Sequence, residues 1–432
     1  MDSYKILIIG LGPVGLATAI GFAYAGHDVV CYDIDKERIN SLKNGATPFF
    51  EQNLQYYLDK HGDKLHFTDN LEEAFSETNV FFICVGTPLG QNNSADMAAF
   101  WNAINDIVKN AKCDSIIVIK STVPIGTNKK VVHYIETLHL KHEFGVVSNP
   151  EFLAQGTSVE DTIKATRIII GCNAPYLRDL MLDIYDKFDG EKIVTTPESA
   201  ELIKYEANCY LAMRVSFVND LAHTCDLVGA DVESVLKGVS MDPRIGTHYF
   251  SPGLGYGGSC FPKDTICFHN QIQAEYGYEL ELIEATIDVN KRHPLRLCRK
   301  IMANCGGDLI NKKISILGLS FKKDTDDVRD SLAVNIVSYL VSNGANVTVW
   351  DPEAMRNAKK IFADKVTYAN SLNEAIDASD TIFIATDWDD IVNIPFDKLK
   401  NKNVYDGRNC YLNRQEEIKF NYYYVGGSIS DK

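Results

Sequence analysis

Residues 5–33 read KILIIGLGPVGLATAIGFAYAGHDVVCYD, and this stretch decides the fold. An aliphatic run, a glycine-rich turn, an alanine-rich stretch and a second aliphatic run predict strand, turn, helix and strand. Residues 6–26 carry no charge and are long enough to suggest a bilayer span. The glycine turn divides them, and a secretory signal needs a shorter apolar core before a small-residue cleavage site. We therefore expect a buried strand and helix, not a membrane segment.

The turn in this stretch has the pattern G-L-G-P-V-G, from Gly10 to Gly15. Gly10 permits a tight turn, Gly12 lets a pyrophosphate approach the backbone, and Gly15 lets the helix pack on the strand. The phosphates of a dinucleotide would lie at the N-terminus of the helix, where backbone N–H groups are free. The position of the motif between strand and helix predicts a dinucleotide site.

Asp33 ends the second aliphatic run. A carboxylate there accepts hydrogen bonds from the adenosine ribose diol and repels a 2′-phosphate, which favours NAD over NADP. Arg38 follows closely and leaves this preference open, because a nearby arginine can accommodate a 2′-phosphate.

The same succession of elements occurs twice. Strand-like and helical runs alternate over the first 150 residues, and KISILGLSFK, NVTVWDPE and DTIFIATDWD repeat the pattern later in the chain. Residues 198–229 have helical periodicity without proline or internal glycine, which predicts one long helix. We therefore predict an α/β fold with two Rossmann-like, doubly wound parallel-sheet domains joined by a central helical domain. The expected domains are residues 1–196 (α/β, with the dinucleotide turn), 197–302 (helical connector) and 303–432 (second α/β domain).

Bulk composition limits the function classes. The 432 residues exceed what one hydrophobic core usually supports, so two or three domains are expected. The formal net charge of −15 argues against nucleic acid and membrane surfaces as partners, since both require clustered cations. The eleven cysteines are scattered singly, without a C-x-x-C pair or a metal-like Cys/His cluster. This pattern predicts a soluble, cytoplasmic protein without a metal site.

The second α/β half has G-L-S-F in place of the glycine turn, so we expect no dinucleotide there in the same pose. Cationic side chains surround this turn and follow a later strand: Lys322, Lys323, Arg329 and Arg408. They would lie near the carboxyl edge of the sheet and suit a ligand diphosphate. A solvated charge run, balanced by Asp324, Asp326 and Asp327, is the other interpretation, and the residues alone favour it.

The most unusual segment is FSPGLGYGGSCFPKD, residues 250–264. Four glycines leave the backbone free to approach a ligand, and Cys260 then stands close to Lys263. A thiolate is favoured beside a lysine or at a helix N-terminus, so Cys260 is a candidate nucleophile. A buried structural cysteine fits the local sequence equally well, and Cys267, in an apolar context, is expected in the core.

Lys204 and Asn208 lie four residues apart on the predicted long helix and therefore on one face. A lysine and an amide aimed at one point can stabilise an oxyanion, although an exposed helical pair also explains the spacing. Glu151 follows a proline at the carboxyl end of a strand, and it is open to the same two interpretations.

Eight features occur in an order that resembles the UDP-glucose/GDP-mannose dehydrogenase family, over almost the whole chain. They are GLGPVG, VGTP, KSTVPIGT, NPEFLAQG, the helix with Lys204 and Asn208, GGSCFPKD, GLSFKKDTDDVRDS and DGRN. The resemblance implies a four-electron oxidation, in which two NAD convert the primary alcohol of UDP-glucose to the carboxylate of UDP-glucuronate. It further implies that Cys260 captures the aldehyde as a thiohemiacetal, which is oxidised to a thioester and hydrolysed.

The resemblance also implies roles for the residues around this cysteine. Lys204 and Asn208 would stabilise the alkoxide and tetrahedral oxyanions. Asp264 would orient or deprotonate water, Glu151 would act as base in hydrolysis, and Thr122 would help to position that water.

Further family positions bind the two ligands. The NAD positions are Gly10, Gly12, Val14, Gly15, Asp33, Arg38, Thr87, Thr122, Lys263 and Arg329. The sugar-nucleotide positions are Glu151, Phe152, Leu153, Lys204, Asn208, Arg244, Tyr249, Phe250, Ser251, Pro252, Gly253, Gly257, Lys322 and Arg408. In relatives the residue at Arg244 reaches the site of a neighbouring subunit and the long helix forms the dimer core. The resemblance therefore implies a homodimer or an assembly of dimers.

One departure and three alternatives remain. Gln155 stands where many relatives have glutamate, and glutamine cannot act as a base. GDP-mannose or a UDP-N-acetylhexosamine are alternative substrates, the latter disfavoured by Ser259 because that branch usually has GGHC. A two-electron hydroxy-acid dehydrogenase would need no nucleophilic cysteine. A non-catalytic nucleotide-binding protein would not need the lysine, asparagine, cysteine and aspartate together.

Overall fold

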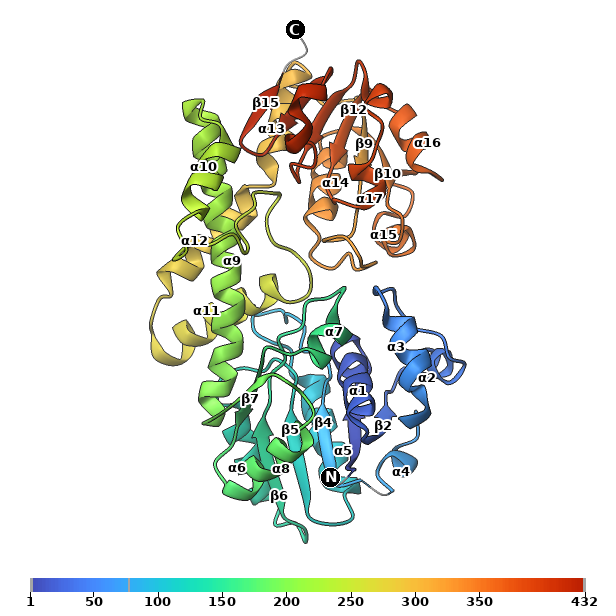
Figure 1. Cartoon of the computed structure of the whole chain (residues 1–432), viewed down its shortest axis with the longest axis vertical. Helices are drawn as coiled ribbons and strands as arrows, with labels where there is room; N and C mark the ends of the chain where they lie inside the picture. The colour runs from blue at the N-terminus through green and yellow to red at the C-terminus, as the bar shows by residue number, and fades with distance from the viewer. Residues whose placement is uncertain (1–2, 77, 430–432) are drawn as a thin grey trace. The chain divides into compact units, whose positions relative to one another are not determined.

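The computed structural model describes residues 3–76 and 78–429. The chain forms two compact units, Met1–Ala207 and Asn208–Lys432 (Figure 1). The boundary falls inside one helix, α9 (Pro197–Val228). The division into domains at residues 196 and 302 stays a prediction.

The first unit is built on a parallel-dominated sheet. Within the described residues its strands are β1 (Lys5–Ile9), β2 (Asp28–Tyr32), β3 (Leu65–Thr68), β4 (Val80–Ile83), β5 (Ser115–Ile119), β6 (Phe144–Ser148), β7 (Arg167–Gly171) and β8 (Glu191–Thr195). Their order is β3-β2-β1-β4-β5-β6-β7-β8. The first six follow the order of a doubly wound dinucleotide-binding sheet.

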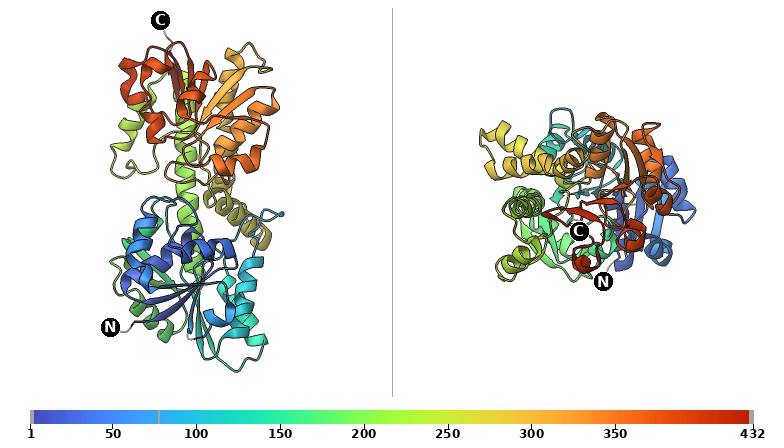
Figure 2. Two further views of the ribbon diagram at one scale, coloured as in Figure 1. Left: turned by 90° about the vertical axis from the view of Figure 1, so that its right-hand side faces the viewer. Right: turned by 90° about the horizontal axis from the view of Figure 1, so that it is seen from above.

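Helices cover both faces of this sheet (Figure 2). They are α1 (Pro13–Ala25), α2 (Lys36–Lys43), α3 (Leu54–His61), the 3-10 helix η1 (Gly62–Lys64), α4 (Leu71–Ala74), α5 (Ala98–Asn110), α6 (Thr127–Thr137), α7 (Ser158–Ile163) and α8 (Pro175–Ile184). Ile6 of β1 packs in one core with Ile20 of α1, and Leu7 packs in the opposite core with Ile104 of α5. A strand buried on both faces requires a continuous apolar run, which explains the ILII sequence.

The long helix is α9, as predicted. It begins at Pro197, whose missing N–H is no loss in a first turn, and ends before Gly229, which has φ +73°. The helices that follow are α10 (Val232–Ser240), α11 (Phe261–Tyr276), α12 (Glu281–Arg292) and α13 (Leu295–Asn304). Nowhere in the described part of the chain is a helix both long and apolar enough to cross a membrane.

The second unit carries a sheet of the same kind. Its strands are β9 (Lys313–Leu317), β10 (Asn346–Trp350), β11 (Thr367–Tyr368), β12 (Thr381–Ile384), β13 (Asn403–Asp406), β14 (Asn421–Tyr424) and β15 (Gly427–Ile429), in the order β11-β10-β9-β12-β13-β14-β15. Its other helices are α14 (Leu332–Ser342), α15 (Met355–Phe362), α16 (Leu372–Asp377), α17 (Asp389–Val392), η2 (Phe396–Leu399) and η3 (Leu412–Glu417). Two parallel-dominated sheets and an intervening helical segment confirm the predicted fold class.

The similarity between the two α/β halves includes an equivalent hydrogen bond in each. After β1, the N–H of Leu11 donates to Asp33 Oδ2 over 2.7 Å, and after β9 the N–H of Leu319 donates to Asp351 Oδ2 over 2.7 Å. In both halves the aspartate that ends the second strand therefore holds the turn that ends the first.

Two pairings depart from a purely parallel arrangement: β6 with β7, and β14 with β15. The strands β3, β7, β8, β11 and β15 were also not foreseen in the sequence. The residues of β8 are mostly exposed, and those of β11 number two. Edge strands bury little surface, so β8 and β11 lack the apolar run that identifies a central strand. β7 does carry such a run, RIIIG, and is buried, so its sequence could have identified it.

Candidate functional site

The glycine turn after β1 has room for a ligand at one position only. A Cβ atom at Gly15 would lie 1.8 Å from the carbonyl oxygen of Gly10, and Gly10 itself has φ +92°. A Cβ atom at Gly12 would meet no atom within 4 Å. Gly12 is the N-cap of α1 and supplies no side chain, so the N–H groups of the first turn, which includes Val14, remain available to a phosphate. These residues fit the pyrophosphate of a dinucleotide.

Asp33 is buried and already accepts hydrogen bonds from the protein. Its Oδ2 accepts from the N–H of Leu11 and from Nη1 of Arg38, both at 2.7 Å, and its Oδ1 accepts from the N–H of Asp35 over 2.9 Å. Arg38 also pairs with the Asp35 carboxylate at 3.3 Å. A carboxylate offers about four acceptor positions, so Oδ1 retains capacity for a ribose hydroxyl. Arg38 thus pairs with two carboxylates, and the Asp33 carboxylate beside it would repel a 2′-phosphate.

Thr87 and Thr122 lie together at the carboxyl edge of the same sheet. Thr87 Oγ1 donates to the carbonyl oxygen of Thr122 over 2.6 Å, which joins the loop after β4 to the loop after β5. Ligands of doubly wound sheets bind at this edge.

Glu151 and Lys204 form a buried ion pair. Lys204 Nζ lies 2.8 Å from Glu151 Oε1, and Glu151 Oε2 accepts from the N–H of Leu153 over 2.6 Å. The same ammonium lies 5.6 Å from the centre of the Phe152 ring. Burial acts to raise the pKa of Glu151, but the Lys204 ammonium, the N–H of Leu153 and the Lys120 charge together hold that pKa below its ordinary value. Glu151 is therefore a carboxylate at neutral pH.

Lys120 is a buried lysine that our sequence reasoning did not single out, although it stands in the KSTVPIGT motif. Its Nζ donates to Asn149 Oδ1 over 3.2 Å and to the hydroxyl of Tyr185 over 3.4 Å. Burial lowers the pKa of Lys120 to about 8. A charged residue directly after an aliphatic strand was the signal that could have identified it.

Cys260 is exposed and is the N-cap residue of α11. The positive end of a 16-residue helix dipole favours a thiolate at this position. Cys267, seven residues further on, is buried, and burial raises the pKa of its thiol to about 11. The structure therefore places Cys260 at an exposed helix N-terminus and Cys267 in the core, the latter as expected.

Asp264 lies one turn after Cys260 and is almost fully buried. Its Oδ2 accepts from Asn208 Nδ2 over 2.6 Å, and its Oδ1 lies 2.5 Å from Lys263 Nζ. Lys263, expected at an NAD position, is thus paired with Asp264 in this structure. Asn208 orients the Asp264 carboxylate by a hydrogen bond, and the Lys263 ammonium lies beside its other oxygen.

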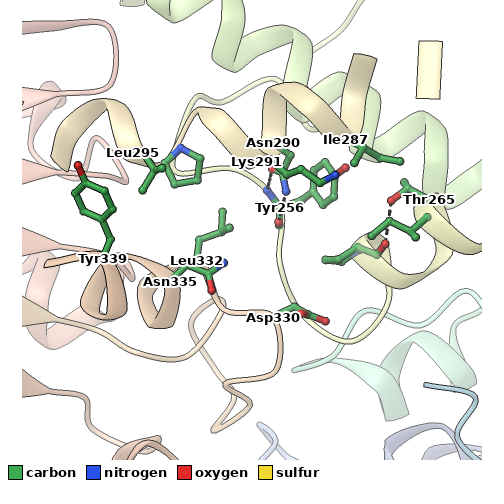
Figure 3. A pocket seen from close by; sticks show the side chains of 13 residues that line it. Tyr256, Thr265, Ile287, Asn290, Lys291, Leu295, Asp330, Leu332, Asn335 and Tyr339 are labelled. Carbon is green, nitrogen blue, oxygen red and sulfur yellow. Dashed lines mark hydrogen bonds between the residues drawn. The ribbon is translucent and has the colours of Figure 1, made fainter. Parts of the chain in front are cut away.

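Side chains from α9, from α12 and from the residue after α12 hold the glycine loop that precedes Cys260. Asn290 of α12 binds both backbone groups of Tyr256: its Oδ1 accepts from the N–H over 2.8 Å and its Nδ2 donates to the carbonyl over 2.9 Å (Figure 3). Asn219 of α9 accepts from the N–H of Gly253 over 2.9 Å, and His293, just after α12, lies 2.9 Å from the Gly253 carbonyl. A Cβ atom on the intervening residue 255 would lie 2.3 Å from Asn290 Oδ1, which explains the glycine there. None of these partners was foreseen.

A pocket opens beside the bond between Asn290 and Tyr256 (Figure 3). Its described lining also includes Thr265 of α11, Asp330, and Tyr339 of α14. The predicted catalytic residues are not among its described lining residues, so this pocket is separate from the proposed reacting groups.

The remaining predicted sugar-nucleotide residues differ in exposure. Phe250 is buried with its ring 6.5 Å from that of Phe217, whereas Tyr249 is 45% exposed at φ +53°. Arg244 is 87% exposed and pairs with Asp242 on its own loop. At Gly257 a Cβ atom would lie 2.5 Å from the Asp330 carbonyl. Ser251, Pro252 and Gly253 complete this segment.

Three cations lie at the carboxyl edge of the second sheet. Arg408 Nε donates to the Ala385 carbonyl over 2.9 Å, and its Nη2 donates to the Phe321 carbonyl over 2.8 Å. Lys322 Nζ lies 5.8 Å from the Phe321 ring. Hydrogen bonding to Asp327 raises the pKa of Arg329, and the charge of Cys260 adds to this effect. Arg408 is oriented by two carbonyl groups, whereas Arg329 pairs with a neighbouring aspartate, as a balanced charge run would also allow.

Each unit thus gathers part of the predicted set. The first holds the glycine turn with Asp33, Arg38, Thr87, Thr122, Glu151 and Lys204, and the second holds Asn208, Cys260, Lys263, Asp264, Lys322, Arg329 and Arg408. Lys204 and Asn208 lie four residues apart on α9.

Comparison with known proteins gives consistent matches along the chain. Three family models match: the NAD binding domain of the UDP-glucose/GDP-mannose dehydrogenase family at residues 4–189, its central domain at 198–292 and its UDP binding domain at 315–413. A UDP-glucose 6-dehydrogenase of Rhizobium meliloti is 39% identical, with 96% of this chain and 97% of the relative covered. UDP-glucose 6-dehydrogenase YwqF of Bacillus subtilis is 36% identical, over 98% and 97%. A solved UDP-glucose dehydrogenase from Pyrobaculum islandicum is 35% identical over 99% and 98% of the two chains, with a TM-score of 0.92.

Proposed function

Because the chain belongs to the UDP-glucose/GDP-mannose dehydrogenase family, we propose that it oxidises UDP-glucose to UDP-glucuronate as an NAD-dependent UDP-glucose 6-dehydrogenase. The observation that carries this proposal is the exposed Cys260 at the N-terminus of α11, with the oriented Asp264 carboxylate one turn behind it. A two-electron alcohol oxidation requires no such nucleophile.

NAD, when bound, accepts one hydride in each of two oxidations. The residues of the glycine turn would hold its pyrophosphate at the N-terminus of α1, and Asp33 would bind the adenosine ribose. Thr87 and Thr122 would lie along the same edge of the sheet. Two observations support this assignment: the open space beside Gly12, where a phosphate could approach the backbone, and the unused acceptor positions of the Asp33 carboxylate.

Cys260 performs the covalent step. The first oxidation removes a hydride and a proton from the C6 alcohol and leaves an aldehyde. The Cys260 thiolate adds to the aldehyde carbon, and the oxygen takes a proton to give a thiohemiacetal. Loss of a second hydride and of the hydroxyl proton gives a thioester, and water cleaves it to the carboxylic acid and the free thiol.

Charged and polar neighbours stabilise these species. The Lys204 ammonium and the Asn208 amide would stabilise negative charge on the C6 oxygen. Asp264, oriented by Asn208, would bind the attacking water. Glu151 is ionised beside Lys204, so it can accept a proton from that water, with Thr122 helping to position it.

The substrate is proposed to bind through further residues. Lys322 and Arg408 would bind the diphosphate, and Phe152 and Leu153 with residues 249–253 and Gly257 would contact the nucleotide and sugar. Arg408 is held rigidly by two carbonyl groups, which is suited to directional phosphate binding.

The test is the stoichiometry of the reaction. We expect about two NADH per UDP-glucose, and a product whose mass corresponds to UDP-glucuronate, because the thioester route transfers two hydrides. One NADH per substrate, with the aldehyde as product, would contradict the proposal. Turnover of GDP-mannose or a UDP-N-acetylhexosamine but not UDP-glucose would replace the proposed substrate.

A homodimer is proposed through α9 and the predicted central domain. On the part of α9 in the second unit, Tyr210, Phe217 and Val228 are 55%, 61% and 71% exposed. Their spacings of seven and eleven residues are close to whole numbers of turns, so the three side chains form one apolar stripe. An exposed stripe of this kind marks a protein interface. Arg244, exposed on a loop of the same unit, is the residue that the family resemblance implies at a neighbouring subunit's site.

Phe217→Asp with Val228→Asp is expected to convert the dimer to a monomer, because two charges would be buried at its centre. Light scattering after size exclusion would measure the mass. Tyr176→Asp in the first unit changes an aromatic side chain that is 57% exposed and serves as the matched control. An unchanged mass in the double variant would argue against this interface.

A cytoplasmic location is also proposed, since all eleven cysteines are free.

A further inference from the structure

Glu201 is a buried carboxylate for which the proposed mechanism has no role. It lies on α9, three residues before Lys204, and is 4% exposed. Its Oε2 accepts from the N–H of Gly126 over 2.6 Å, and its Oε1 accepts from the N–H of Asn128 over 2.9 Å. The hydroxyl of Ser148 donates to the same Oε1 over 3.3 Å. One side chain of α9 thus binds two other segments of the first unit.

The two N–H groups belong to the start of α6. Gly126 is the N-cap of this helix and has no side chain with which to bind the free N–H groups of the first turn. The Glu201 carboxylate caps the helix instead, although it lies 75 residues further along the chain than Gly126. A carboxylate is the favoured group at this end of a helix dipole.

Each segment that Glu201 joins carries a residue of the proposed reaction. Helix α9 carries Lys204, the loop before α6 carries Thr122, and β6, which ends at Ser148, leads directly to Glu151. Glu201, Thr122 and Lys204 also line one small cavity in the first unit. A change in the Glu201 contacts would therefore displace these three groups relative to one another.

We infer that Glu201 is a positioning residue of the proposed oxidation, one that holds Lys204, Thr122 and Glu151 in register by binding α9 to the start of α6 and the end of β6. This inference rests on the proposed function. The carboxylate form is required, because only it accepts from both backbone N–H groups without presenting a proton to them.

The protonation of Glu201 gives this role a measurable signature. Burial raises the pKa of Glu201 to about 7, although the N–H groups of α6 and the hydroxyl of Ser148 act to lower it. Glu198, one turn back on α9, raises it further. The other charged groups on the surrounding elements are Lys204, Glu151 and Lys120, already described, and Lys129 and Lys130 on α6. The contacts should therefore loosen as the pH falls through about 7.

The central variant is Glu201→Gln, which keeps the length of the side chain but turns an NH₂ group toward a backbone N–H. We expect kcat for UDP-glucose at pH 8.5 to fall between about tenfold and 100-fold, the size of effect that a small misplacement of reacting groups produces. The acid limb of the wild-type kcat profile near pH 7 should be absent in Glu201→Gln. A variant profile identical to that of the wild type would overturn the inference.

Thermal stability should move in the opposite direction to activity. A carboxyl group whose folded-state pKa is raised above 4.5 contributes stability at low pH and loses it as the pH rises through about 7. The Tm of Glu201→Gln relative to wild type should therefore increase from pH 6 to pH 8.5, while its relative kcat decreases. A residue that only held the fold together would lower both. This series needs no substrate, so it also tests the titration of Glu201 if UDP-glucose proves not to be oxidised.

Two milder variants provide a test that does not depend on Glu201→Gln folding. Ser148→Ala removes a bond that lowers the pKa of Glu201, so the acid limb should move to higher pH. Glu198→Gln, on an exposed part of α9, removes a charge that raises it, so the limb should move to lower pH with kcat at pH 8.5 unchanged. An acid limb that stays in place in both variants would overturn the inference.

Discussion

Cys260→Ala is expected to lower turnover of UDP-glucose by more than about 10³-fold, because no other group in the proposed route can carry the acyl intermediate. Binding of NAD and UDP-glucose should survive, since the side chain is exposed and its loss leaves no cavity. Steady-state NADH formation and equilibrium binding would measure the two effects separately.

Two further cysteine variants sharpen this result. Cys260→Ser should accumulate an ester that is hydrolysed slowly, detectable as a mass increase of the intact protein after a single turnover. Cys267→Ala is the matched control, because that thiol is buried seven residues away and should be dispensable for turnover. Wild-type rates in Cys260→Ala would exclude the covalent mechanism.

Lys204→Ala is expected to lose both activity and stability. Activity should fall by about 10²- to 10³-fold through loss of an oxyanion donor. Removing one partner of a buried ion pair costs about 3–5 kcal/mol of unfolding free energy, because Glu151 would remain buried without its cation. Chemical denaturation and steady-state kinetics would measure the two losses.

The pH dependence identifies the cause of the stability loss. In the wild type, Lys204 holds the pKa of Glu151 below its ordinary value of 4.5, so the pair stabilises the fold above that pH and less as the pH falls. Without Lys204, burial raises that pKa instead, so the deficit of the variant should be largest at neutral pH and shrink toward pH 4. The double variant Lys204→Met with Glu151→Gln removes both charges and should regain stability but not activity. Recovery of turnover in the double variant would argue that Lys204 has only a structural role.

The sequence supports the central strands and the glycine turn because their determinants are local. A strand buried on both faces needs consecutive apolar residues, as in β1, and a helix that packs on it needs glycine where the backbone approaches. Cys260 at a helix N-terminus is also local, since Pro262 and the preceding glycines mark the start of α11. Edge strands such as β8 bury little and leave no such pattern.

The sequence did not reveal which distant residues form ion pairs and hydrogen bonds with one another. Glu151 and Lys204 were each recognised as candidates. Their ion pair forms only because the loop after β6 packs against α9, and the two residues are 53 positions apart in the chain (204 − 151). The contacts of Glu201 with α6 and of Asn290 with Tyr256 span 75 and 34 residues. Spacing in the chain determines which residues share a strand or a helix face, and so the sequence determined the fold class, the dinucleotide turn and the candidate nucleophile. Only the packing of distant segments decides which buried charge faces which donor, and so the tertiary structure alone decided the ionised state of Glu151 and the position of Glu201.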